Sequence, residues 1–382
     1  MSTGPSSLLA TLSLALPVGL AAQTGQFVVR LGRDTLAIEQ YTRSADRLEG
    51  EQVVRNPRTV HRIYSVTFGP SGAAERYELV THNVSGGPGP AETRATATFQ
   101  GDSAVATVPR RDSSATVRSR VGAGALPFLG QSFGLVEEVT RRARAAGGDS
   151  FTMSMLVLGD TAPMPVTVTR AGADSLILML DGIGPLRARV DDRGTLRGVS
   201  GMGGTAQITV ERVQGLDFAS LGKSFAPRSL GTLSPPDSVR AHVGGAAVGV
   251  RYSRPSMRGR TIFGTVVPWD KVWRTGANEA TIFETSADLL VAGTTVPAGQ
   301  YSLWTIPAPG GWKLIVNKNT GQWGTDYDAQ YDVARLDMKV ETLKQPVEQF
   351  TIAVEPKGKG GVLKLEWEKT RASVPLSVIS RP

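Results

Sequence analysis

The stretch YSRPSMRGRTIFGTVVPWDKVWRTGANEAT, residues 252–281, is the most informative part of this chain of 382 residues. Counting from Arg251, arginine occupies four positions within ten residues, and two tryptophans, Trp269 and Trp273, follow. Glycine, proline and asparagine mark turns here, whereas the β-branched and aromatic residues favour short strands. Tryptophan and arginine supply much of the energy at recognition surfaces. The stretch therefore predicts a β-rich segment that carries a binding surface.

The polar and aromatic residues of this stretch form the candidate binding site. Once brought together, arginine, amide and carboxylate groups can satisfy one another and bind a carboxylate, a phosphate or a sugar. In the alternative interpretation, Arg274 and Glu279 form a structural ion pair and the aromatic side chains pack in the core. The six candidate binding residues are Tyr252, Arg254, Trp273, Arg274, Asn278 and Glu279.

Strand patterns continue on both sides of the stretch. Short apolar runs between Leu289 and Trp367, separated by glycine- and proline-containing turns, predict an antiparallel β-sandwich or jelly-roll-like domain. In the earlier part, turns at residues 32–34 and 191–194 separate apolar runs typical of hairpins. We therefore expect a mainly β chain with two antiparallel β-rich domains, the first a curved sheet or half-barrel with one helix.

That helix is expected over residues 132–146, because one face carries Phe133, Val136, Val139 and Ala143 at helical spacing. The preceding Gly130-Gln131-Ser132-Phe133-Gly134 fits the pattern of a serine-hydrolase nucleophile elbow. The elbow requires a good strand before it and a parallel sheet covered by several helices, which the surrounding sequence does not provide. Ser132 is therefore expected to be the helix N-cap.

Composition predicts the domain boundaries. An apolar run from Leu8 to Leu20, followed by Ala21-Ala22, predicts a signal peptide over residues 1–22, although it lacks the usual basic residues at its start. All six tryptophans and all but one of the lysines follow a Pro/Ser/Gly-rich linker candidate at residues 226–238. The expected domains are residues 23–225 and 239–382, in a periplasmic or secreted protein.

The chain contains few of the residues that usually serve in catalysis or bind metals. The chain has no cysteine and three histidines, none of which is spaced as a metal-ligand pair. We therefore expect no catalytic residues, no metal site and no cofactor. The net charge is +8, but no run of five basic residues occurs, so no nucleic-acid partner is expected.

From about residue 240 to 377 the chain resembles the domain-of-unknown-function family numbered 2911. The family's signature motifs are present at residues 252–260, 272–281, 297–303, 317–318 and 322–324. The resemblance implies a bacterial, exported protein and brings no catalytic residues with it. The hairpins and single helix of residues 23–225 resemble the half-barrels of periplasmic lipoprotein carriers.

These observations predict a non-enzymatic, exported accessory protein that docks on a protein partner, such as the periplasmic face of a membrane-bound complex. One alternative is a binding protein, with a lipid in the concave face of the first domain or a glycan on the tryptophan-rich second domain. Another is a hydrolase that uses Glu279 with Glu366 or Glu368, since general acid–base catalysis needs a second carboxylate or a histidine.

Overall fold

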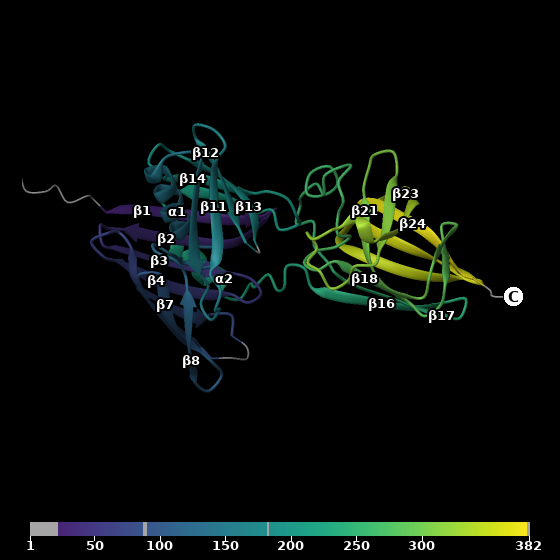
Figure 1. Ribbon diagram of the computed structural model, residues 1–382, viewed down its shortest axis with the longest axis horizontal. Helices are drawn as coiled ribbons and strands as arrows, with labels where there is room; N and C mark the ends of the chain where they lie inside the picture. The colour runs from purple at the N-terminus through teal and green to yellow at the C-terminus, as the bar shows by residue number, and fades with distance from the viewer. Residues whose placement is uncertain (1–21, 87–89, 182, 380–382) are drawn as a thin grey trace, which may run out of the picture.

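The computed structural model describes residues 22–86, 90–181 and 183–379, so the expected signal peptide lies outside the described residues except for Ala22. The strands form two sheets, one of 15 strands and one of nine. The two sheets lie side by side along the long axis of the molecule (Figure 1). The expectation of a mainly β chain with two β-rich domains is therefore confirmed.

The first sheet follows the chain in two meanders that meet at its centre. Strands β1 to β8 lie in sequence order on one side, and β1 also pairs with β15, from which the order continues to β9. All pairs are antiparallel except β9–β10. The strands are β1 (Gln23–Leu31), β2 (Asp34–Arg43), β3 (Arg47–Val54), β4 (Val60–Phe68), β5 (Ala74–Asn83), β6 (Glu92–Gln100), β7 (Ser103–Pro109), β8 (Ser114–Arg120), β9 (Leu126–Pro127), β10 (Ser150–Leu156), β11 (Met164–Arg170), β12 (Ser175–Leu180), β13 (Gly184–Val190), β14 (Leu196–Gly201) and β15 (Thr209–Val213).

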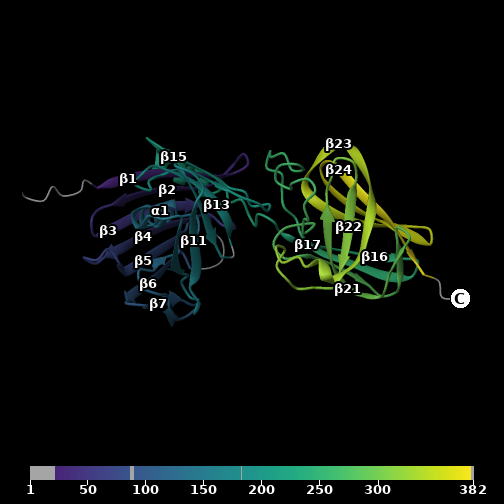
Figure 2. The same ribbon diagram turned by 45° about the horizontal axis from the view of Figure 1, so that its top comes forward.

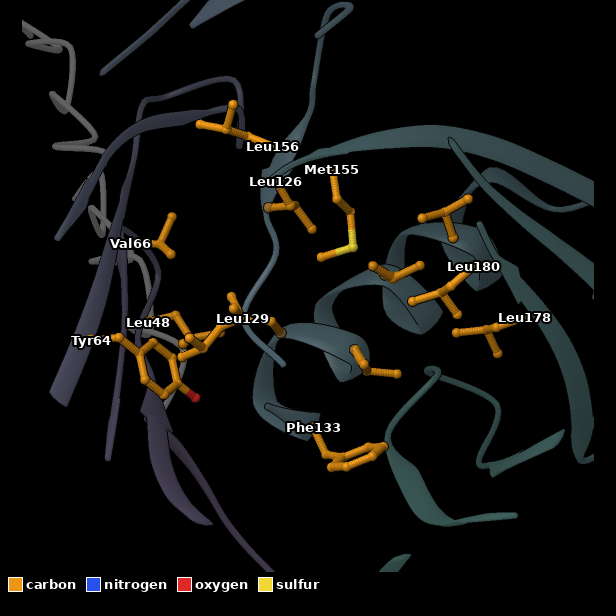
Figure 3. Close-up of a cluster of buried hydrophobic side chains, with 14 of the residues drawn as sticks. Leu48, Tyr64, Val66, Leu126, Leu129, Phe133, Met155, Leu156, Leu178 and Leu180 are labelled. Atoms are coloured by element: carbon orange, nitrogen blue, oxygen red, sulfur yellow. The ribbon is translucent and has the colours of Figure 1, made fainter. Parts of the chain in front are cut away.

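The concave face of this sheet is filled by helix α1 (Phe133–Ala146). In Figure 3, α1 lies between strands that carry Tyr64 and Val66 on one side and Leu178 and Leu180 on the other. The expected N-cap is confirmed, because the Ser132 hydroxyl accepts a hydrogen bond from the amide of Leu135. The helix is buried on nearly all sides, polar residues included.

The polar side of α1 is held by ion pairs inside the domain. Glu137 is 1% exposed and accepts hydrogen bonds from Tyr41 Oη at 2.5 Å, Arg141 Nη2 at 2.6 Å and the amide of Leu196 at 2.9 Å. Arg212 also contacts its carboxylate. A buried carboxylate needs such partners because desolvation penalises an isolated charge. These bonds attach the helix to β2, β14 and β15.

A second helix, α2 (Phe218–Phe225), was not expected from the sequence. It lies on the convex face of the sheet, where Phe218 packs with Val28, Ile38 and Val53. Among the described residues, no helix is long and apolar enough to span a membrane.

The second sheet curls into a sandwich-like domain. Its order is β16-β17-β18-β21-β22-β23-β24-β19-β20, and β16 at one edge also contacts β23 and β24. Figure 2 shows β23 and β24 crossing the domain as two long neighbouring strands. The elements are β16 (Pro236–Val243), β17 (Ala246–Ser253), β18 (Thr281–Thr285), β19 (Leu289–Val291), β20 (Thr294–Val296), β21 (Gly299–Ile306), β22 (Trp312–Asn317), the 3₁₀ turn η1 (Ala329–Tyr331), β23 (Asp332–Lys357) and β24 (Gly360–Val378).

The arginine-rich motif joins the two domains. Arg258 donates from Nη1 to Asp34 Oδ2 at 2.5 Å, and its carbonyl accepts the amide of Arg33 at 2.8 Å. Arg260 Nη1 donates to the carbonyl of Thr205 at 2.7 Å. The turn before Asp34 approaches closely because Gly32, at φ 60°, has no side chain; a Cβ there would lie 2.2 Å from the Arg258 carbonyl oxygen.

We expect residues 234–382 to fold when expressed alone, because this segment contains its own sheet and an apolar core of its own. The fragment is expected to show one cooperative thermal transition with a β-type circular dichroism spectrum. An aggregated fragment, or one without a cooperative transition, would show that the junction contacts are needed for folding.

Candidate functional site

Two of the six candidate residues belong to the core of the second domain. Tyr252 is 5% exposed and Trp273 is 7% exposed, and both rings pack edge-on against Phe350. The Trp273 ring also stacks on Trp367, with centroids 5.9 Å apart. Four of the six tryptophans are buried, so most of the aromatic content expected at a surface fills this core instead: Trp273, Trp304, Trp312 and Trp367.

Arg254, which follows the end of β17, forms hydrogen bonds with β23 and β16. Its guanidinium donates to the Phe350 carbonyl at 3.0 Å, to Thr351 Oγ1 at 2.8 Å and to Asp237 Oδ2 at 3.1 Å. Three of its five N–H groups therefore donate hydrogen bonds within the domain. This arrangement gives Arg254 a structural role in the domain.

The other three candidate residues lie where two distant segments meet. The Gly324 amide donates to the Asn278 carbonyl at 3.0 Å, and the Ala280 amide donates to the Gln322 carbonyl at 3.2 Å. A β-bridge pairs Glu279 with Trp323. The motif at residues 272–281 and the motif at residues 322–324 therefore form one surface.

We call this the Trp323 surface, made of Arg274, Asn278, Glu279 and Trp323. Trp323 is 44% exposed, whereas the four core tryptophans are 7% exposed or less. Sequence reasoning missed Trp323, although the Gln-Trp-Gly motif that contains it was among the signatures of the resemblance.

The backbone of this surface is unusual. Thr275 at φ 53° and Asn278 at φ 60° both have left-handed conformations, which cost free energy in residues other than glycine. Thr275 is fully buried, and its carbonyl accepts a 2.7 Å bond from Thr281 Oγ1. The Asn278 side chain donates to Ser253 Oγ at 3.3 Å. The fold thus holds two residues in left-handed conformations within the segment that pairs with the Trp323 loop.

The alternative interpretation proposed a structural ion pair between Arg274 and Glu279, and this part of it is wrong. Glu279 is exposed, and no ion pair joins the two side chains among the described residues. Arg274 instead donates from Nη1 to the Asn278 carbonyl at 3.1 Å. Burial lowers the pKa of Arg274, while the nearby Asp326 acts in the opposite direction. The aromatic part of that alternative is confirmed for Tyr252 and Trp273.

The three carboxylates of the hydrolase alternative each have separate contacts. Glu366 accepts a hydrogen bond from Arg371 Nε, and Glu368 accepts a 3.4 Å bond from the amide of Phe263. Glu279 lies at the bridge with Trp323. No contact between described residues joins Glu279 to either of the others. Nor do three or more histidine and carboxylate side chains gather as a metal site within the described ranges.

No curated protein matches the chain. The solved structures similar to this chain include two that are each 12% identical to it, with the match covering 50% of this chain and 95% of the other chain. One is a beta-barrel-like protein of the domain of unknown function DUF1849 from Brucella abortus, with a TM-score of 0.34. The other is a DUF1089 family protein from Pseudomonas aeruginosa, with a TM-score of 0.30. Residues 234–376 match the model of the family "Protein of unknown function (DUF2911)", which confirms for the C-terminal part of the chain the family indicated by its sequence motifs.

Proposed function

We propose that the protein is a non-enzymatic, exported accessory protein that docks on a protein partner through the Trp323 surface. The observation that carries the proposal is the 44% exposure of Trp323 in a domain whose other tryptophans are mostly buried. An exposed tryptophan presents a large apolar area with few rotatable bonds, and tryptophan is enriched among the residues that dominate binding energy.

The loops that carry Trp323 are already fixed in place. Backbone bonds hold them on both sides of the bridge between Glu279 and Trp323. The stem of Arg274 also packs tightly against Gly324, where a Cβ would lie 2.3 Å from Arg274 Cδ. A surface that is ordered before binding avoids the entropy cost of ordering it on association. This favours docking without a large rearrangement.

The polar groups around Trp323 suit the rim of a protein interface. Glu279 is exposed, and Arg274 makes one hydrogen bond through a guanidinium that has five donors. The first domain also lies next to the Trp323 surface, because a Cβ on Gly204 would lie 3.5 Å from Arg274 Nη2. A partner seated on the Trp323 surface would therefore contact the side of the molecule where the two domains meet.

We expect Trp323→Ala to weaken partner binding about tenfold or more, because interface tryptophans often contribute over 2 kcal/mol. The change in unfolding free energy is expected to stay within about 0.5 kcal/mol, since Trp323 is 44% exposed and lies at the surface of the domain. Thermal melting measures the stability of the variant. Crosslinking in the native host uses the photoreactive aromatic amino acid benzoylphenylalanine at position 323, which keeps a large ring there, and the binding of the crosslinked partner to Trp323→Ala and to the unsubstituted chain then gives the loss of affinity.

The matched control is position 331, because Tyr331 has the same exposure of 44%. A discrete protein adduct formed from position 323 and missing from position 331 would support the proposal. The same adducts from both positions, or none from position 323, would contradict it. A glycan or lipid adduct at position 323 would favour the binding-protein alternative.

A further inference from the structure

The convex face of the first sheet carries a groove beside helix α2. The groove has a volume of about 1030 Å³ and is open along strands β1 to β5. The part of this face next to it is covered by α2, through Phe218 packed on Val28, Ile38 and Val53. The groove is therefore a part of the convex face that α2 leaves uncovered.

Strand register places polar side chains in rows across the groove floor. One row pairs Gln26 with Gln40 and Gln40 with Glu51, and continues to Ile63 and Val80 on the next two strands. Neighbouring strands lie about 4.8 Å apart, so this row spans roughly 19 Å. The next row along the strands is wholly polar: Thr24, Thr42, Glu49, Ser65 and Glu78.

The three polar members of the first row, Gln26, Gln40 and Glu51, form a continuous hydrogen-bonded chain that ends at His61. Gln26 accepts from the amide of Leu216 at 2.9 Å and donates to its carbonyl at 3.2 Å. It also donates to Gln40 Oε1 at 3.3 Å, and Gln40 donates to Glu51 Oε1 at 2.6 Å. His61 Nε2 lies 2.7 Å from Glu51 Oε2. These planar groups are held in fixed orientations, which is the pre-organisation that a binding site needs.

Each carboxylate that lines the groove already has a partner. Glu49 pairs with Arg47 at 2.5 Å, and Glu78 pairs with Arg76 at 2.7 Å. Glu51 accepts hydrogen bonds from Gln40 and His61. A charged ligand would have to displace these partners, whereas a neutral ligand with many hydroxyl groups can add donors and acceptors to them.

The groove also offers an apolar strip beside its polar rows. Ile63 is 44% exposed and stands next to Val80 across the β4–β5 pair. Sugar rings present hydroxyl groups at their edge and C–H groups on their faces, and this strip can bury the C–H groups. From the polar floor whose carboxylates already have partners, the length of the groove and this apolar strip, we infer that the groove binds a neutral oligosaccharide. This site is separate from the Trp323 surface.

The test is titration calorimetry of the full chain with three neutral probes: cellohexaose, chitohexaose and maltohexaose. At least one is expected to bind with a submillimolar Kd. Gln40→Leu is expected to weaken that binding about tenfold or more, because it breaks the amide chain and leaves ligand hydroxyls without partners. Ile63→Arg, a change at an exposed position, is expected to do the same by obstructing the groove.

Gln100→Leu is the matched control. Gln100 lies on β6 of the same sheet, is exposed and does not line the groove. It should leave sugar binding unchanged, and thermal melting of all three variants should confirm that they fold. The inference is overturned if none of the three sugars binds, or if Gln40→Leu and Ile63→Arg bind as well as the unsubstituted chain. Binding of phosphatidylcholine vesicles or a heparin-derived hexasaccharide in place of the neutral sugars would also overturn it.

Discussion

Glu137→Ala is expected to lower the unfolding free energy of the first domain by about 3–5 kcal/mol, the cost of breaking a buried ion pair by removing one partner. The substitution leaves Arg212 and Arg141 without their carboxylate, and it leaves the amide of Leu196 and the hydroxyl of Tyr41 without an acceptor. Urea unfolding followed by circular dichroism measures the effect.

The control for this substitution is Glu211→Ala, on the same strand as Arg212. Glu211 pairs with Arg30 at 4.0 Å and its side chain is 60% exposed, so the expected cost is below about 1 kcal/mol. If both substitutions cost the same, the buried contacts of Glu137 do not hold α1 in place. If the first domain of Glu137→Ala shows no unfolding transition at all, the domain is already unfolded. That result would agree with the upper end of the expected loss of stability.

The second large effect is expected at Glu39, a fully buried carboxyl group beneath the start of α1. One of its oxygens, Oε2, accepts hydrogen bonds from the amides of Phe133 at 2.6 Å and Gly134 at 3.0 Å. The other, Oε1, lies 2.6 Å from both the Ser132 and Tyr64 hydroxyl oxygens. Glu39→Ala leaves these groups unsatisfied and opens a cavity, so we expect a loss of about 3 kcal/mol or more.

Glu39→Gln is expected to cost much less, because a glutamine oxygen can accept from the two amides while its NH₂ group donates to the two hydroxyl oxygens. Burial is the main cause that raises the pKa of Glu39 above its ordinary value of 4.5, against opposing hydrogen bonds. The protonated carboxyl group resembles glutamine in its hydrogen bonding. The comparison therefore tests which protonation state the folded protein holds.

The raised pKa also fixes the direction of a pH effect. A carboxyl group with a raised pKa in the folded state adds stability below pH 4.5, and that stability is lost as pH rises through the folded-state pKa. The glutamine side chain of the Glu39→Gln variant does not titrate. We therefore expect the stability advantage of the unsubstituted chain over this variant to shrink as pH is raised from about 4.5 to 8. An advantage that grows with pH in urea titrations would contradict the raised pKa.

The local features of the fold were predictable from the sequence because they depend on neighbouring residues. The turn at residues 32–34, the hairpin around residues 191–194 and the N-cap at Ser132 were expected and are present. Two strands of the second domain, Leu289–Val291 and Thr294–Val296, lie within the region where short apolar runs predicted strands. Each of these signals is carried by a few adjacent side chains.

Features that depend on contacts between distant segments were not predictable. By sequence, Glu137 is a carboxylate on a helix. Its contacts with Tyr41, Leu196 and Arg212, each far away along the chain, make it part of the interior. The concave face, where one alternative placed a lipid, is filled by α1, which packs against strands from both halves of the sheet. The six residues of the candidate site divide between core and surface because Trp273 and Tyr252 turn toward Phe350, while Glu279 pairs with Trp323 of a distant loop.

The pairing of β1 with β15 has a consequence for the order of folding. Gln26 pairs with Val213, so the central strand of the first sheet gains its second neighbour only when nearly the whole domain has been synthesised. Closing such a long loop before the contact stabilises the chain slows folding. During synthesis, strands β1 to β8 therefore carry an open edge at β1 until residue 213 emerges. Unpaired edges of this kind promote aggregation, so a chaperone that covers β1 should raise the yield of the full chain.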